Sequence, residues 1–568
     1  MNTSKAIIRQ LVQTIALKGV KYCVISPGSR NAPLVIAFNA LKSIQCLTVI
    51  DERSAAFFAL GIAQQSGRPV ALVCTSGSAL LNYAPAIAEA FYQKIPLLLL
   101  TGDRPPEWID QDDGQTIRQS SLFANYVKAS YTLPADEAHP DDLWFARRIA
   151  SEAVNKAMET SGPVHINVPL REPLYGETDT KDAGVRDIEL VPVVKSLTPE
   201  RVKELSDLWK KAHRRMVICG MGKPDEKVNG LLSSLAKKHS AAVLTETTSN
   251  MRDEAFVCNI DGYFERLTEK EKKELAPDLL ITYGGPVTTK KFKAYLRKYN
   301  PAEHWHISPE GSHTDTYQSL TRVLPLHAAD VLAILDRAKP ARPGNYAGKI
   351  IKIASGALKD LAEYGRQIPF SDLKAFQMIW KRLPENSLVQ IGNSTPIRYA
   401  NLMPPAGNIS YFANRGVSGI DGTMSTAAGA AFASGKLTTL IVGDLGFMYD
   451  LNALWNKKLP PNLRIIAINN GGGGIFRIID SKSTPLLENY FEAAHFTKLE
   501  PFVKAFGVSY CSACDEESLR EGLSFLYESS GGKQVSSGKP KVLEIFTPRL
   551  TNAEVLLRYF SFLKKKQL

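Results

Sequence analysis

Short apolar runs alternate with amphipathic stretches along the first part of the chain, up to about residue 175. Five of these runs have the length and composition of buried strands: residues 20–26, 46–50, 70–74, 96–100 and 164–168. Between them, residues 55–65 and 80–92 show the apolar spacing of helices that pack one face against a sheet. This alternation predicts a parallel sheet with helices on both faces.

The same alternation recurs in two later parts of the chain. The strands predicted in the second part are residues 215–219, 242–245, 279–283 and 305–307. Those predicted in the third part are residues 388–391, 409–412, 439–442, 463–468 and 541–546. The run of small residues at 425–435 predicts a helix that packs tightly against a neighbour. We therefore expect an α/β protein with three doubly wound parallel-sheet domains.

Polar stretches with Pro and Gly separate the three parts and have the composition of linkers. The expected segments are a first domain at 1–178, a linker at 179–196, a central domain at 197–338, a linker and helix at 339–371, and a last domain at 372–568. Gly220-Met221-Gly222 follows a strand of the central part, but the third glycine of a nucleotide motif is missing. We interpret it as a turn.

The overall composition is that of a soluble globular protein, with 44% hydrophobic and 22% charged residues. The apolar runs are too short to span a bilayer, and the N-terminus lacks the features of a signal peptide. We therefore expect a cytoplasmic protein. The net charge of +12 raises a nucleic-acid hypothesis, but the basic residues are scattered and form a clear run only at 564–566.

The chain has seven cysteines, an odd and scattered set that argues against a disulfide framework. Cys511 and Cys514 form a lone CxxC motif. A structural zinc site needs about four ligands, and no second pair or nearby histidine supplies them. We do not assign a metal or redox role to this motif.

The most informative local pattern is Gly443-Asp444-Leu445-Gly446, with Asn470 placed 26 positions after Asp444. Each of the two oxygen-bearing residues follows a predicted strand, and a helix-like segment at 449–458 lies between those strands. Adjacent parallel strands bring such residues together at the carboxyl edge of a sheet, where ligands of α/β proteins bind. Taken singly, each motif has a plain explanation as a cap or a loop. Together they predict an oxygen-rich cradle for Mg²⁺ and a diphosphate.

This pattern resembles the signature of the thiamine diphosphate enzymes, and several peptides make a closer resemblance. They are Ser26-Pro27-Gly28-Ser29-Arg30, Asp51-Glu52-Arg53, Thr75-Ser76-Gly77-Ser78-Ala79, Asp103-Arg104-Pro105-Pro106-Glu107, Gln115-Thr116-Ile117-Arg118-Gln119, Gly392-Asn393-Ser394 and Asn414-Arg415-Gly416-Val417-Ser418-Gly419-Ile420-Asp421-Gly422. The set resembles the MenD family, the 2-succinyl-5-enolpyruvyl-6-hydroxy-3-cyclohexene-1-carboxylate (SEPHCHC) synthases of menaquinone (vitamin K2) biosynthesis. It covers nearly the whole chain in order and spacing.

The resemblance implies a transferase in which a pyrimidine domain comes first, a central domain second and a pyrophosphate domain third. The implied reaction decarboxylates 2-oxoglutarate and adds the resulting succinyl-semialdehyde carbanion to isochorismate in a Stetter-type 1,4-addition. The implied cofactors are thiamine diphosphate and Mg²⁺ or Mn²⁺. The resemblance also implies a homodimer with shared active sites, or a homotetramer, and it implies neither a nucleic-acid partner nor a membrane span.

Residue by residue, the resemblance assigns catalysis to Glu52, whose carboxyl group would face the aminopyrimidine ring of the cofactor. At the start of a helix, Glu52 could equally serve only to stabilise the first turn. The implied metal ligands are Asp444, Asn470 and the carbonyl group of Gly472. The other cofactor-binding residues that it implies are Gly392, Asn393, Ser418, Gly419, Ile420, Leu445, Ile475 and Phe476.

Both implied substrates carry more than one anionic group, and arginine grips carboxylates through two parallel hydrogen bonds. The substrate-binding residues that the resemblance implies are Ser29, Arg30, Arg104, Gln115, Lys290, Ser394, Arg398 and Arg415. Three alternatives stay open at this point. They are another carboligase or decarboxylase of the acetolactate-synthase type, a binding protein that kept the fold without catalysis, and a basic nucleic-acid-binding protein.

Overall fold

The computed structural model describes residues 1–137, 139–180, 184–338, 344–479, 484–528 and 538–566. The strands of these residues form three six-stranded parallel sheets and one short antiparallel pair, β1 (Asn2–Thr3) with β8 (Glu177–Thr178). The prediction of three parallel-sheet α/β domains is therefore confirmed. Parts of both predicted linkers, residues 181–183 and 339–343, lie outside the described residues.

The first sheet has the strand order β3-β2-β4-β5-β7-β6. Its strands are β2 (Tyr22–Ile25), β3 (Gln45–Thr48), β4 (Val70–Cys74), β5 (Leu97–Asp103), β6 (Ser130–Thr132) and β7 (Val164–Pro169). Its helices are α1 (Ala6–Leu17), α2 (Ala32–Asn39), α3 (Glu52–Ser66), α4 (Ala84–Gln93) and α5 (Pro140–Glu159). The predicted helix at 80–92 is divided, because a 3₁₀ helix over Gly77–Tyr83 precedes α4. Pro85 lies in the first turn of α4, where its missing N–H costs least.

The last sheet repeats this topology with the order β16-β15-β17-β18-β20-β19. Its strands are β15 (Leu388–Ile391), β16 (Ser410–Phe412), β17 (Thr438–Gly443), β18 (Leu463–Asn469), β19 (Ser509–Ala513) and β20 (Lys541–Phe546). Its helices are α13 (Asp372–Arg382), α14 (Thr395–Ala400), α15 (Thr423–Ser434), α16 (Asp444–Tyr449), α17 (Glu500–Ala505), α18 (Glu516–Tyr527) and α19 (Arg549–Lys565). In both sheets the first and third strands in chain order are neighbours, so the direction of winding reverses between them. This point marks the crevice where ligands of open α/β sheets bind.

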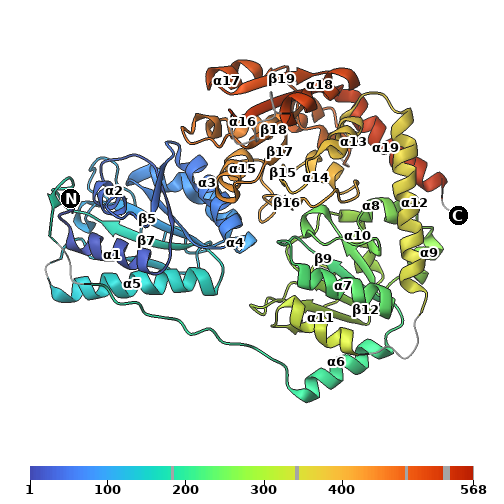
Figure 1. Cartoon of the computed structure of the whole chain (residues 1–568), viewed down its shortest axis with the longest axis horizontal. Helices are drawn as coiled ribbons and strands as arrows, with labels where there is room; N and C mark the ends of the chain where they lie inside the picture. Colours follow the sequence, from blue (N-terminus) through green and yellow to red (C-terminus); the bar gives the residue numbers. More distant parts are fainter. Residues whose placement is uncertain (138, 181–183, 339–343, 480–483, 529–537, 567–568) are drawn as a thin grey trace.

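The central sheet has a different order, β11-β10-β9-β12-β13-β14. Its strands are β9 (Arg215–Cys219), β10 (Ala242–Thr245), β11 (Phe256–Val257), β12 (Leu279–Tyr283), β13 (Glu303–Ile307) and β14 (Arg322–Leu324). Its helices are α6 (Pro199–Lys211), α7 (Glu226–His239), α8 (Ile260–Glu265), α9 (Glu269–Glu274), α10 (Lys290–Lys298) and α11 (Ala328–Arg337). The long helix α12 (Tyr346–Gln367) then runs along one side of this domain to the last one (Figure 1).

Two turns at the carboxyl ends of β9 and β12 pack against each other in the central domain. The Gly285 N–H donates to the Met221 carbonyl at 2.7 Å, and a Cβ at Gly220 would lie 2.0 Å from the Gly285 carbonyl oxygen. The turn over Gly220-Met221-Gly222 therefore packs against the turn after β12, as expected for a structural turn.

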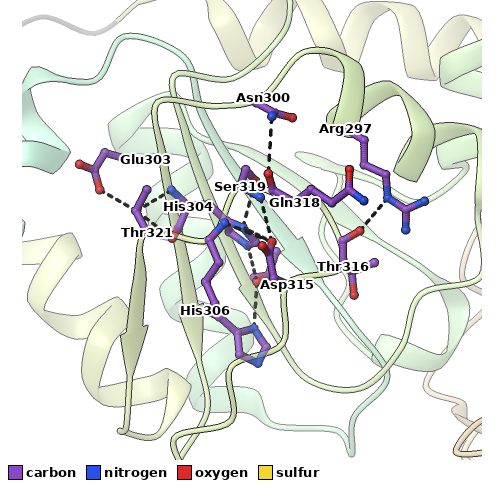
Figure 2. A network of polar contacts seen from close by, with 12 residues as sticks. Arg297, Asn300, Glu303, His304, His306, Asp315, Thr316, Gln318, Ser319 and Thr321 are labelled. Atoms are coloured by element: carbon purple, nitrogen blue, oxygen red, sulfur yellow. Dashed lines mark hydrogen bonds and ion pairs between the residues drawn. The ribbon is translucent and has the colours of Figure 1, made fainter.

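A polar network in the central domain extends from two buried histidines to the loop before β14 (Figure 2). The Thr282 hydroxyl lies 3.0 Å from His304 Nε2 and 3.0 Å from His306 Nδ1. Asp315 accepts a hydrogen bond from the Ser319 N–H at 2.9 Å. Burial lowers the pKa of His304 to about 4, so this imidazole is neutral near pH 7. We interpret the network as a support for the loop between β13 and β14.

The first and last domains are joined by an apolar core, whereas an extended segment leads from the first domain to the central one (Figure 1). Among the described elements, helices α3 and α15 make the most extensive contact between these domains. A Cβ at Gly61 of α3 would lie 2.1 Å from the Thr426 carbonyl oxygen, and a Cβ at Gly429 of α15 would lie 2.0 Å from the Phe58 carbonyl oxygen. The predicted tight packing of the small-residue helix is thus observed, and a glycine on each helix allows it.

Candidate active site

Asp444 and Asn470 lie next to each other at the carboxyl edge of the last sheet. Strands β17 and β18 are direct neighbours, with Gly443 opposite Ile468. Asp444 follows β17 as the first residue of α16, Asn470 follows β18, and both side chains are buried. The Asp444 carboxylate accepts hydrogen bonds from the N–H groups of Leu445 at 2.7 Å and Gly472 at 2.9 Å. Leu445 therefore contributes its backbone, a role that does not require glycine.

A cavity of about 210 Å³ opens beside these two residues. Its walls come from residues 393–396, 442–446, 470 and 472–476, together with Ile420 and Thr423. These segments follow β15, β17 and β18, and the first two flank the point where the sheet reverses its winding. The implied residues that line the cavity are Asn393, Ser394, Ile420, Asp444, Leu445, Asn470, Gly472, Ile475 and Phe476.

The side chain of Asn470 is oriented by a residue that the sequence did not single out, Asp372 at the start of α13. The Asn470 amide nitrogen donates to Asp372 Oδ2 at 2.9 Å, and the Thr547 hydroxyl donates to Asp372 Oδ1 at 2.6 Å. Burial raises the pKa of Asp372 to about 6. Since its amide nitrogen is engaged, Asn470 retains its carbonyl oxygen for a cation.

The turn at Gly472 has a shape that glycine alone adopts easily. Its φ is +137°, and a Cβ would lie 2.7 Å from the Glu492 carbonyl oxygen. The Glu492 side chain is fully buried and accepts hydrogen bonds from Arg477 and Arg549 at 2.6–2.8 Å. This buried ion cluster holds the glycine-rich segment against α19. Sequence reasoning missed it because its members are far apart in the chain.

The donors at this cavity suit a hard divalent cation. A buried carboxylate, an oriented amide oxygen and a glycine-rich turn supply oxygen ligands, which Mg²⁺ prefers. His495 also contacts the Asp444 carboxylate, with Nε2 3.3 Å from Oδ2, and this contact raises the pKa of His495. Among the residues that the structure describes, no cluster of three His, Cys, Asp or Glu side chains could hold a metal. Cys511 and Cys514 have free thiols.

A second segment, residues 414–419, lies beside the cavity and is held by Asn393. The Asn393 amide donates to the carbonyl groups of Asn414 and Gly419, both at 2.6 Å, and its oxygen accepts from Arg415 at 3.1 Å. Ser418 adopts a positive φ of 70° in this segment. Gly392 precedes Asn393, and a Cβ there would lie 3.2 Å from the backbone of β17. The structure thus brings Gly392, Asn393, Ser418, Gly419 and Ile420 to one place.

Two implied arginines of the last domain, Arg398 and Arg415, lie near a buried carboxylate of the central domain, Glu246. The N–H groups of Thr288 and Thr289, just before Lys290, donate to Glu246 at 2.7–3.0 Å. Burial lowers the pKa of Arg398 and of Arg415, and Glu246 opposes this effect at both. Arg398 also donates to the Ser394 carbonyl. Arg398 and Arg415 therefore lie between the cavity and the central domain.

The remaining implied residues lie on the first domain, at the carboxyl edge of its sheet. Arg30 donates to the Leu170 carbonyl at 2.9 Å, and Arg104 donates to the Gly114 carbonyl at 2.9 Å. Burial lowers the pKa of Arg30, and the nearby Arg104 lowers it further. Ser29 precedes Arg30, and Gln115 packs on Gly77, where a Cβ would lie 3.2 Å from the Gln115 Cα.

Glu52 also lies on the first domain, and it is not among the residues that line the cavity. It begins α3, directly after Asp51, which caps the helix by accepting the Ser54 N–H at 2.9 Å. Burial raises the pKa of Glu52, and Asp51 adds to the rise. Within one chain the implied residues thus form two groups, one on the first domain and one around the cavity.

Comparison with known proteins agrees with this architecture. Residues 1–122 match the family model described as "Thiamine pyrophosphate enzyme, N-terminal TPP binding domain". The structure is similar to that of benzoylformate decarboxylase from Polynucleobacter necessarius, with a TM-score of 0.70 over 97% of this chain and 99% of that one. The two sequences are only 16% identical, so this likeness concerns the fold. No described helix is both long and apolar enough to cross a membrane.

Much closer relatives are named 2-succinyl-5-enolpyruvyl-6-hydroxy-3-cyclohexene-1-carboxylate synthase. The one from Christiangramia forsetii is 42% identical, over 98% of this chain and 99% of its own. Those from Flavobacterium johnsoniae and Porphyromonas gingivalis are 41% and 39% identical, and the alignments cover 96–98% of each chain. The chain therefore belongs to the SEPHCHC synthase family of thiamine diphosphate-dependent enzymes.

Proposed function

We propose that this enzyme decarboxylates 2-oxoglutarate and adds the remaining succinyl-semialdehyde unit to isochorismate, which gives SEPHCHC and CO₂ for menaquinone biosynthesis. The observation that supports this proposal most strongly is the 42% identity to a named SEPHCHC synthase over 98% of the chain. The cavity at the edge of the last sheet, with its oxygen donors and nearby arginines, provides independent chemical support.

We propose that Asp444, Asn470 and the Gly472 carbonyl would hold Mg²⁺ or Mn²⁺ at the diphosphate end of the cofactor site. When bound, thiamine diphosphate supplies the carbanion chemistry of the reaction. Glu52 presents its carboxyl group to the aminopyrimidine ring, and its burial suits a group that exchanges a proton. Ile420, Ile475 and Phe476 form the apolar wall that keeps water from the reacting atoms.

Substrate recognition in this proposal depends on cations from both groups. Around the cavity Arg398, Arg415 and Lys290 face the anionic substrates, and Ser394 adds a hydroxyl group. From the first domain come Ser29, Arg30, Arg104 and Gln115. Guanidinium groups suit this task because they keep their charge when buried and bind carboxylates through two donors.

We further propose that two chains complete each site, since Glu52 is not among the residues that line the cavity of its own chain. In a dimer, the first domain of one chain faces the last domain of its partner, and two such dimers form a tetramer. The functional division follows residues 1–178 for the pyrimidine domain, 197–338 for the central domain and 372–568 for the pyrophosphate domain. A cytoplasmic location stays a prediction from composition.

The purified protein tests this function with thiamine diphosphate, Mg²⁺, 2-oxoglutarate and isochorismate. We expect the isochorismate absorbance to fall only when all four are present. Release of CO₂ from 2-oxoglutarate without loss of isochorismate would contradict the proposed acceptor. Turnover of pyruvate, with 2-oxoglutarate left unused, would instead point to an acetolactate-synthase-like enzyme.

A further inference from the structure

Glu89, on α4 of the first domain, has an environment that no assigned role explains. Its side chain is only 3% exposed, and its carboxylate points across the interface between the first and last domains. A buried carboxylate is costly unless hydrogen bonds compensate for the lost water. Backbone groups of the other domain supply much of this compensation.

Two consecutive backbone N–H groups of the last domain bind this carboxylate. The Gly416 N–H donates to Glu89 Oε1 at 2.6 Å, and the Val417 N–H donates to Oε2 at 2.7 Å. Gln93, one turn further along α4, donates its amide to Oε1 at 2.5 Å. Successive N–H groups that converge in this way form a nest for an anion, and Glu89 occupies it.

The segment that Glu89 holds is the one that carries Arg415 and leads into Ser418 and Gly419. Asn393 binds this segment from the side of the cavity, and Glu89 binds it from the opposite domain. The contact leaves no room for a larger residue at position 416. A Cβ on Gly416 would lie 2.8 Å from the Glu89 carbonyl oxygen and 3.0 Å from the Tyr92 Cβ.

The charge of Glu89 also acts on Arg415. Burial lowers the pKa of Arg415, and the carboxylates of Glu246 and Glu89 both oppose this effect. The Arg415 Nε atom is buried and has no hydrogen-bond acceptor among the described residues. The Arg415 guanidinium group is thus oriented by its bond to Asn393, and its Nε–H is left to donate to a bound anion.

Three glutamines connect the Glu89 contact to the segment that follows β15. Gln64 of α3 donates to Gln93 at 3.5 Å, and Gln390 at the end of β15 donates to Gln64 at 2.7 Å. Gln390 lies just before Gly392 and Asn393, whose amide binds the 414–419 segment. Side chains of the first domain thereby touch both segments that shape this wall of the cavity.

We propose that Glu89 is a positioning residue for the reaction, which holds the 414–419 segment from the neighbouring domain so that Arg415 meets an anionic substrate. This inference rests on the proposed function for the role of Arg415. Glu89 touches neither substrate nor cofactor in this proposal, and it acts through the backbone of Gly416 and Val417.

The test compares Glu89→Gln with wild type and with Glu310→Gln. The control makes the same chemical change at Glu310, whose carboxylate pairs at 2.6 Å with Lys94 at the end of α4 and accepts a hydrogen bond from Ser308 at 3.0 Å. In Glu89→Gln an NH₂ group replaces one carboxylate oxygen. This group cannot accept a hydrogen bond from a backbone N–H, so one of the two bonds to Gly416 and Val417 is lost. We expect the KM for isochorismate or for 2-oxoglutarate to rise roughly tenfold, with the Kd for thiamine diphosphate and kcat little changed. Glu89→Asp, which keeps the charge, should restore part of the loss.

A second measurement, amide hydrogen exchange over residues 414–419, does not depend on activity. It should be faster in Glu89→Gln than in wild type and Glu310→Gln, because one of the N–H groups of Gly416 and Val417 loses its acceptor and the other keeps only an uncharged one. If Glu89→Gln does not fold, Gly416→Ala applies the same test, since its Cβ pushes the segment away from α4. Unchanged exchange, or equal KM values in an active wild type and the variant, would overturn the proposal. An inactive wild type with faster exchange in Glu89→Gln would contradict the proposed reaction and leave the contact established.

Discussion

The proposal that Glu52 serves the cavity of the partner chain leads to a quantitative prediction about mixed dimers. Glu52→Gln removes the carboxyl group from the first domain, and Asp444→Ala removes a metal ligand from the last. Each variant alone should lose most turnover. If each site takes Glu52 from one chain and Asp444 from the other, a mixed dimer has one intact site and one site with both lesions.

The magnitude follows from this geometry. When the two variants pair at random in a symmetric dimer, about half of the dimers are mixed and half of their sites are intact, which gives about a quarter of wild-type activity. If both residues served the same site from a single chain, every site of a mixed dimer would carry one lesion. The expected recovery would then be close to zero.

The assay coexpresses the two variants with different affinity tags and measures turnover of the total pool and of the doubly purified mixed dimers. The mixed dimers should recover about half of wild-type activity per dimer. A matched control mixes Glu52→Gln with Glu52→Ala, which cannot complement in either arrangement. Absence of recovery in stable mixed dimers would refute the shared site.

Three further predictions concern single residues. Asp444→Ala should weaken binding of thiamine diphosphate in the presence of Mg²⁺ by roughly tenfold or more, because a charged ligand is lost; an unchanged Kd by calorimetry would contradict the cradle. Arg415→Ala should raise the KM for a substrate by roughly tenfold and leave the cofactor Kd near wild type, whereas the exposed Arg118→Ala should change neither. Gly61→Ala should destabilise the fold by about 1–3 kcal/mol, since its Cβ would lie 2.1 Å from the Thr426 carbonyl oxygen. Denaturant titration measures this loss against Gly230→Ala, a helical glycine with open space around it, and equal stability of the two variants would count against tight α3–α15 packing.

The three parallel-sheet α/β folds were largely predictable from the sequence, because buried parallel strands leave a strong apolar signal. The proximity of Asp444 and Asn470 followed from the same signal, since both residues come directly after such strands. The segment at 449–458 was predicted less well. The structure has α16 over Asp444–Tyr449 and a 3₁₀ helix over Leu451–Trp455 in its place. Between them the buried Asp450 accepts hydrogen bonds from the N–H and hydroxyl groups of Ser425 on α15, which favours a break in the helix.

The residues that support the site could not be found in the same way. Asp372 orients Asn470 from 98 positions away, and Glu89 holds Gly416 from 327 positions away. Each one stands on a helix, where an acidic residue is ordinarily exposed or stabilises the first turn. Only the fold reveals that these carboxylates are buried against backbone and amide groups of distant segments. The identical strand order of the first and last sheets could not be read from the sequence either, because two domains can share a topology without sharing a repeated sequence.

The proposed reaction is tested most directly by the identity of its product. The purified enzyme, with thiamine diphosphate and Mg²⁺, would receive isochorismate and 2-oxoglutarate labelled with ¹³C at every carbon, and mass spectrometry would follow the label. We predict a product that joins isochorismate to all the labelled carbons except the one released as CO₂. Labelled CO₂ with unmodified isochorismate, or a product without the label, would contradict the proposed function.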